Sequence, residues 1–233
     1  PTARDEEALQ RVLLSNAMLF LLRGVPVVYY GDEQGFIGHG IDQAARQDMF
    51  ASQVDLHNDT YDLIGTSATT ADENFDTKHP LFRHITDLAE LREEHPALAD
   101  GAQVHRYSTS GAGIFAFSRM DATEQVEYVV AVNNSDTAET ATFDTYQPAR
   151  SMLKGVWPAS AQRNLKTDAE GRVTVTVPAR SAVVYRANAK LRADDEAPAP
   201  VFTVPGDTGI VTGRAEVGVT VPGGDFTQVT FAW

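Results

Sequence analysis

The fold is decided by the stretch Gly24-Val25-Pro26-Val27-Val28-Tyr29-Tyr30-Gly31-Asp32-Glu33-Gln34-Gly35, an apolar run that ends in two carboxylates between glycines. A strand that is apolar along its whole length is typical of a parallel sheet, because both faces of such a sheet are covered. In α/β barrels the polar groups at the carboxyl ends of the strands build the active site. The pattern therefore predicts a barrel strand over residues 25–30, with Asp32 and Glu33 on the site face.

Helical patterns lie on both sides of this run. Residues 5–23 combine acidic side chains in the first turn with apolar side chains at spacings of three and four, and Arg23 and Gly24 supply stop signals. Residues 80–94 place a second apolar stripe on one helical face. The order helix, strand, helix agrees with one end of an α/β barrel.

Further segments extend the pattern and together carry a family resemblance. They are Ile41-Asp42-Gln43-Ala44-Ala45-Arg46-Gln47-Asp48-Met49, residues 88–98, residues 113–119 and residues 129–133. In this order and spacing they resemble the α-amylase family of glycoside hydrolases over roughly residues 5–190. The resemblance implies that 24–35 is the last barrel strand, 41–49 the Asp-plus-Arg segment after it, 88–98 the last barrel helix, and the other two segments strands of the following β-domain.

The resemblance also implies what the chain lacks. In this family the nucleophile Asp, the acid/base Glu and a third Asp follow earlier barrel strands, and no such segments occur in this sequence. We therefore expect the C-terminal part of a larger, retaining α-glucan hydrolase that is inactive by itself. A transglycosylase or debranching relative shares the last-strand motif and stays open, as does a non-catalytic carbohydrate-binding module.

The expected domains are an α/β barrel remnant over 1–100, an all-β antiparallel sandwich over 101–190, a linker over 191–200, and the start of an immunoglobulin-like or carbohydrate-binding β-module over 201–233. The prediction of a sandwich rests on short runs of alternating polarity that are separated by turn signals. These runs are 103–109, 113–120, 126–133, 140–144, 150–156, 172–178 and 181–187. In the last module, strands are expected over 201–204, 209–221 and 226–233.

The candidate substrate-binding residues are Tyr30, Asp32, Glu33, Asp42 and Arg46. Asp32 and Glu33 are adjacent, and consecutive strand residues point to opposite faces, so they cannot easily form a retaining pair of carboxyl groups about 5–5.5 Å apart. No catalytic residue is therefore expected in this chain.

Each candidate also has a structural interpretation. Glu33 is expected to be hydrogen-bonded at the barrel mouth, where it would orient its neighbours. Arg46 is expected in a buried ion-pair cluster with Asp42 and Asp48 rather than at sugar hydroxyls, because a guanidinium fork suits carboxylates. Tyr30 is as well suited to the barrel mouth as to stacking on a sugar.

A long polar connection over 31–79 separates the run from the second helix, and its length favours an ordered wall of a cleft. Its acidic residues make calcium a possible ligand, with a solvated acidic loop as the favoured alternative. They are Asp55, Asp59, Asp62, Asp72, Glu73 and Asp76. Trp157 and Trp233 are candidate carbohydrate platforms, although core packing is favoured for both.

Charge and hydropathy limit the partners. The net charge of −13 argues against binding to nucleic acid or to an anionic membrane, so a neutral α-glucan is the expected ligand. No apolar run is long enough to span a bilayer, and we expect an extracellular protein. Without its other strands the barrel piece would expose apolar faces. We expect the upstream half of the barrel, or a second copy, to bury Leu13, Phe20, Val27 and Ile85.

Overall fold

The computed structural model describes residues 3–38, 41–58, 63–158, 163–191, 200–204 and 218–221. The chain divides into two compact units, residues 1–191 and 192–233, and each is described by itself. The division lies at the expected start of the linker. Among the described residues, no helix is long and apolar enough to cross a membrane.

The described residues of the first unit form three α-helices. They are α1 (Ala3–Leu21), α2 (Pro80–Glu94) and α3 (Pro96–Asp100). The first turn of α2 is set by Pro80, which needs no hydrogen-bond acceptor, and by the His79 ring, whose Nδ1 accepts from the Leu81 amide at 3.2 Å. The helices predicted over 5–23 and 80–94 are confirmed, whereas the short α3 was not predicted.

The β-strands form an antiparallel six-stranded sheet in the order β1-β2-β3-β8-β5-β6 and a separate antiparallel pair, β4 with β7. Their bounds are β1 Ala102–Ser108, β2 Ile114–Met120, β3 Val126–Asn133, β4 Glu139–Asp144, β5 Met152–Trp157, β6 Leu165–Lys166, β7 Arg172–Val177 and β8 Ser181–Lys190. Each of the seven runs predicted for the sandwich is a strand. Only β6 was missed, because two residues carry no readable alternation.

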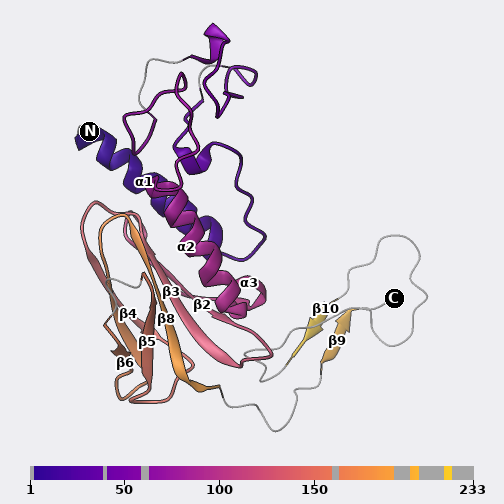
Figure 1. Ribbon diagram of the computed structural model, residues 1–233. Coiled ribbons are helices and arrows are strands. Elements are labelled where there is room, and N and C mark those ends of the chain that lie inside the picture. Colours follow the sequence, from indigo (N-terminus) through magenta and orange to yellow (C-terminus); the bar gives the residue numbers. More distant parts are fainter. Residues whose placement is uncertain are drawn as a thin grey trace. The chain divides into compact units, whose positions relative to one another are not determined.

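Burial shows that the centre of the six-stranded sheet is covered on both faces. All residues of β3 are buried, whereas β7 alternates between exposed and buried positions. A strand that is buried throughout needs a layer on each side, and one that alternates has one face in water. The helices run along one side of the sheet in Figure 1, and the β4–β7 pair supplies the other layer. The predicted sandwich is thus present, with the helices as a third layer.

The helices and the sheet share one hydrophobic core. It contains Leu21 of α1, Leu88 of α2 and Leu98 of α3 together with sheet residues such as Val129 and Val184. The boundary expected between residues 100 and 101 therefore lies inside a continuous core, and the assignment of 1–100 to a barrel stays a prediction.

The expectation that the helix faces lack a cover is wrong for Phe20, which is buried, and for Ile85, which packs on the core; Leu13 is half-buried. α1 packs on β8 and β3 of the sheet and on α2, so the sheet and the neighbouring helix supply this cover.

The strand predicted over residues 25–30 is not formed. This segment pairs with none of the described strands, and Val25 and Val27 are 86% and 73% exposed. An apolar run predicts burial, but a strand also needs a hydrogen-bonding neighbour, and the described residues provide none. Val28 alone in this run packs against the core.

The second unit contains the antiparallel pair of β9 (Val201–Val204) and β10 (Gly218–Thr220). The strand predicted over 201–204 is confirmed, and β10 lies within the run predicted over 209–221. The predicted strand over 226–233, including Trp233, lies outside the described residues. Residues 192–199 of the predicted linker also lie outside them.

Candidate functional site

The site begins at a short 3-10 turn, η1 (Asp32–Gln34), which follows the apolar run. Gly31 and Gly35 flank it with φ angles of 92° and 77°, a region that strongly favours glycine. A side chain at Gly35 would also collide with the carbonyl oxygen of Ile64, whose amide donates to the Gly35 carbonyl oxygen at 3.0 Å. The two glycines therefore let the chain turn sharply while it packs against the long connection.

Both acidic residues of the turn bind its own backbone. The Tyr29 amide donates to Asp32 Oδ2 at 3.1 Å, and the Gly31 amide donates to Glu33 Oε2 at 2.9 Å. Asp32 is exposed and Glu33 is half-buried. These bonds are consistent with the structural interpretation of Glu33.

Gln34 ties the turn to the residues before α2. Its side chain is 3% exposed, its Nε2 donates to the Asp76 carbonyl at 3.2 Å, and its Oε1 accepts from the Asp76 amide at 3.1 Å. Sequence reasoning missed Gln34. The only available signal was an amide side chain in a turn bounded by glycines, which does not reveal a partner 42 residues away.

A hollow of about 390 Å³ lies between the apolar run and α2. It is lined by Val28, Tyr29, Tyr30, Glu33, Phe82, Ile85 and Thr86. The rings of Tyr29 and Tyr30 lie 4.6 Å apart at 40°, and one carboxylate, that of Glu33, reaches the same space. Aromatic rings beside a hydrogen-bonding group suit a sugar, which has apolar faces and polar edges.

The surroundings of Tyr30 bring more of the predicted residues into one region. Burial, the neighbouring Tyr29 and the charge of Asp48 raise the pKa of the Tyr30 phenol, while the charge of Arg46 opposes this rise. Tyr30 and Glu33 therefore line one hollow, Asp32 lies on the same turn, and Arg46 is close enough to act on Tyr30 electrostatically.

The ion-pair cluster differs from the expected one. Arg46 Nη2 lies 2.7 Å from Asp42 Oδ2, but their side chains are 60% and 70% exposed, so the expected burial is wrong. Burying both charges would carry a large desolvation cost, whereas a pair four residues apart forms readily at the surface. Asp48 instead accepts a hydrogen bond from Ser52 Oγ at 2.7 Å and lies 3.4 Å from His57 Nδ1. The Ser52 hydroxyl is the main reason that the pKa of Asp48 is lowered.

Metal ligation has no support in the described ranges, which contain no group of three or more His, Asp or Glu side chains able to hold an ion. Two carboxylates considered for calcium, Asp59 and Asp62, lie outside those ranges. Trp157 is half-buried, and its ring lies 5.6 Å from that of His84 on α2. This contact agrees with packing rather than with an open carbohydrate platform.

Comparison with known proteins identifies the sheet. Residues 107–188 match the family described as alpha amylase, C-terminal all-beta domain. The chain carries the C-terminal all-β domain of the α-amylase family. The predicted resemblance to this family is thereby confirmed, and it extends beyond the β-domain: the chain is 48% identical over 232 residues to the alpha-amylase of Streptomyces lividans.

The chain spans only 25% of the length of that Streptomyces α-amylase, although all of this chain is covered. Among solved structures, the alpha-amylase of Geobacillus thermoleovorans, complexed with acarbose, is 20% identical with a TM-score of 0.58, covering 78% of this chain and 34% of its own. The debranching enzyme of Nostoc punctiforme is 23% identical with a TM-score of 0.51, covering 76% of this chain and 31% of its own. At these identities the two structures show a shared α-amylase-type fold.

Proposed function

We propose that this chain is the C-terminal part of a retaining α-amylase-type hydrolase that acts on starch-like α-glucans. The observation that carries the proposal is the 48% identity to a Streptomyces α-amylase over 232 residues, which includes the glycine-flanked turn and the hollow beside it. In the proposed enzyme the two catalytic carboxyl groups come from residues outside this chain, one releasing the leaving group and the other attacking the sugar.

The residues of this chain would form one rim of the cleft. Tyr30 would pack a ring against a glucosyl unit, Glu33 would hold the Gly31 backbone in place, and the exposed carboxylate of Asp32 would reach sugar hydroxyls. The ion pair between Asp42 and Arg46 is exposed to solvent, so both side chains could leave this pair and hydrogen-bond to sugar hydroxyls instead. Neutral hydroxyls also suit a chain with a net charge of −13.

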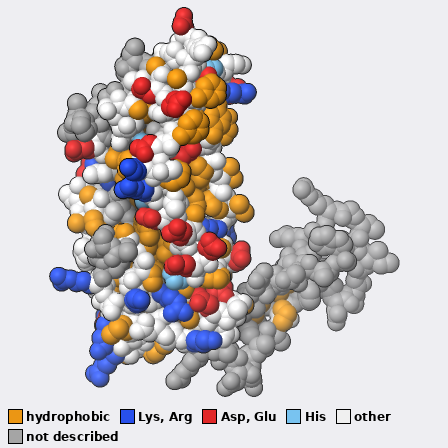
Figure 2. Space-filling view, in the orientation of Figure 1, with side chains coloured by type: hydrophobic (Ala, Val, Ile, Leu, Met, Phe, Trp, Pro, Cys, Tyr) orange, Lys and Arg blue, Asp and Glu red, His pale blue; other side chains and the backbone are white. Residues whose placement is uncertain are grey.

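The exposed apolar residues of the run require a cover, and we propose that the remainder of the barrel provides it. Val25, Val27 and Tyr29 are 86%, 73% and 57% exposed, and the backbone of residues 25–30 has no ladder partner among the described strands. Figure 2 shows hydrophobic side chains gathered on the side of the molecule where this segment runs in Figure 1. A barrel strand on each side would satisfy the backbone and bury this surface.

A debranching or transglycosylase relative is the alternative, and the Nostoc punctiforme debranching enzyme, with a TM-score of 0.51, shares the fold. We also propose that the protein is extracellular. Starch-hydrolysing activity found in the culture supernatant rather than in the cells would support this location.

The test of the rim compares Tyr30→Ala with Phe50→Ala in the longer protein of which we propose this chain is part. Phe50 is the matched control, because it is 56% exposed and does not line the hollow. Loss of one stacking contact should lower kcat/KM on soluble starch about tenfold for Tyr30→Ala. The Phe50 variant should keep its activity. Equal activities of the two variants would remove Tyr30 from the proposed site, and an absence of starch hydrolysis in the parent protein would overturn the proposed function.

A further inference from the structure

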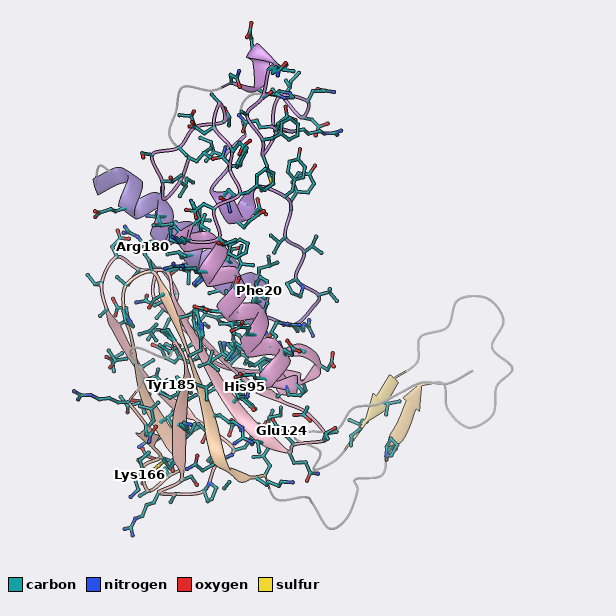
Figure 3. All side chains as sticks on the ribbon, in the orientation of Figure 1. Phe20, His95, Glu124, Lys166, Arg180 and Tyr185 are labelled. Carbon is teal, nitrogen blue, oxygen red and sulfur yellow. The ribbon has the colours of Figure 1, made fainter. Side chains whose placement is uncertain are left out.

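The exit of α1, defined here as residues 20–24, is held by side chains from three different elements. Arg92 of α2 donates from Nη1 to the Phe20 carbonyl at 2.6 Å and from Nη2 to the Gly24 carbonyl at 3.1 Å. Gln103 Oε1 of β1 accepts from the Arg23 amide at 3.0 Å. Arg119 Nη1 of β2 donates to the Leu21 carbonyl at 3.2 Å. Figure 3 shows Phe20 where α1 and α2 run side by side.

The same two guanidinium groups also bind the end of α3. Arg92 Nη1 donates to the Leu98 carbonyl at 2.8 Å, and Arg119 Nη2 donates to the Ala99 carbonyl at 3.3 Å. The last carbonyls of a helix have no partner within the helix and carry partial negative charge. Two cations thus lie between two helix ends and satisfy both.

Arg119 is the buried member of this arrangement. Its side chain is fully buried, and the ion pairs of the described residues do not include it. Burial, followed by repulsion from Arg92, lowers its pKa to about 10. A buried cation is costly unless its donors are satisfied. The Nη1 and Nη2 donors of Arg119 are satisfied by the carbonyl oxygens of the helix ends, whereas its buried Nε has no partner among the described residues.

The segment after the exit has few other attachments. Gly24 has a φ of 122° and open space around its Cα, and residues 25–30 form no ladder with the described strands. The next firm contacts are Val28 with the core and the bonds that join Gln34 to Asp76. The direction of the run is therefore fixed at one end by the exit and at the other by the turn.

We propose that Arg92, Gln103 and Arg119 are positioning residues through which α2 and the β-domain fix the direction of the run that carries Tyr30 and Glu33. Removing one of them releases the run locally and leaves the sheet folded. The positions of these three residues do not depend on the proposed function, whereas any effect on starch turnover does. A negative exchange experiment would therefore overturn the positioning proposal alone, and an absence of starch hydrolysis would overturn the proposed function alone.

The experiment is hydrogen exchange of the whole chain, comparing Arg119→Met, Arg119→Lys and Leu153→Ala. Leu153 is fully buried in β5 and is not among the exit contacts, so its variant reports general destabilisation. Loss of a charged hydrogen bond should accelerate exchange in a peptide covering residues 20–30 about tenfold in Arg119→Met. Exchange in β3 and β8 should change less than about twofold, because their ladder bonds remain. Exchange over residues 20–30 in Arg119→Lys should be faster than in the unchanged chain and slower than in Arg119→Met, because one ammonium group reaches fewer carbonyls than a guanidinium.

A uniform acceleration that matches Leu153→Ala, or unchanged exchange over residues 20–30, would overturn the proposal. If Arg119→Met does not fold, Gln103→Ala takes its place, because Gln103 is only half-buried and its loss frees one amide, that of Arg23. The same local acceleration is expected, and its absence would again count against the proposal.

Discussion

Replacing Leu88 of α2 by Ala probes whether the helices and the sheet are one folding unit. Leu88 is fully buried and belongs to the same hydrophobic cluster as the sheet residues. A buried Leu→Ala change costs about 3 kcal/mol, from lost transfer free energy plus the cavity that remains. For a unit of about 190 residues, this corresponds to a fall in Tm of about 6–12 °C.

The assay follows thermal unfolding by far-ultraviolet circular dichroism and by Trp157 fluorescence, with Trp233 replaced by Phe so that Trp157 alone reports on the sheet. Both signals should give one coincident transition that shifts together in Leu88→Ala. Glu90→Ala is the matched control on an exposed position of the same helix, and its free energy of unfolding should change by less than about 0.5 kcal/mol. A Trp157 transition that keeps its midpoint in Leu88→Ala would refute the shared core.

Three other outcomes follow from the structure. Burial lowers the pKa values of His79, His84 and His95, so below about pH 6.5 the unfolded chain binds more protons than the folded chain. The free energy of unfolding should therefore fall as the pH drops from about 7 toward 5, and Tm measured in a pH series would show this. Gly35→Ala should lower the free energy of unfolding by about 1–3 kcal/mol in urea titrations, whereas Gly111→Ala, with open space around it, should be near neutral. Gln34→Met should accelerate amide exchange at residues 31–36 and 74–78, because the Asp76 amide and carbonyl lose their partner.

The elements with local patterns were predictable from the sequence. The alternation of Val173, Val175 and Val177 marks β7, and the apolar stripe with its leading proline marks α2. Both signals reflect burial against one neighbouring surface, which a short window of sequence records.

The remaining features depend on contacts between distant residues. The run 25–30 reads as a buried strand, but its state depends on ladder partners that its own sequence does not encode. Gln34 meets Asp76 across 42 residues, and Arg119 meets Leu21 across 98, so neither role has a local signature. In the candidate site, Tyr30 and Glu33 line one hollow. The burial expected for the Asp42–Arg46 pair was wrong, because solvation of the charges outweighs the ion pair.

We propose that this chain forms the rim of a starch-binding cleft whose catalytic carboxyl groups come from residues outside it. The most direct test is the release of reducing sugar from soluble starch, measured side by side for this chain and for the longer protein of which we propose it is part. We expect turnover by the longer protein and none by this chain. Turnover by this chain alone that is abolished in Glu33→Gln would contradict the proposal, because Glu33 would then be a catalytic residue.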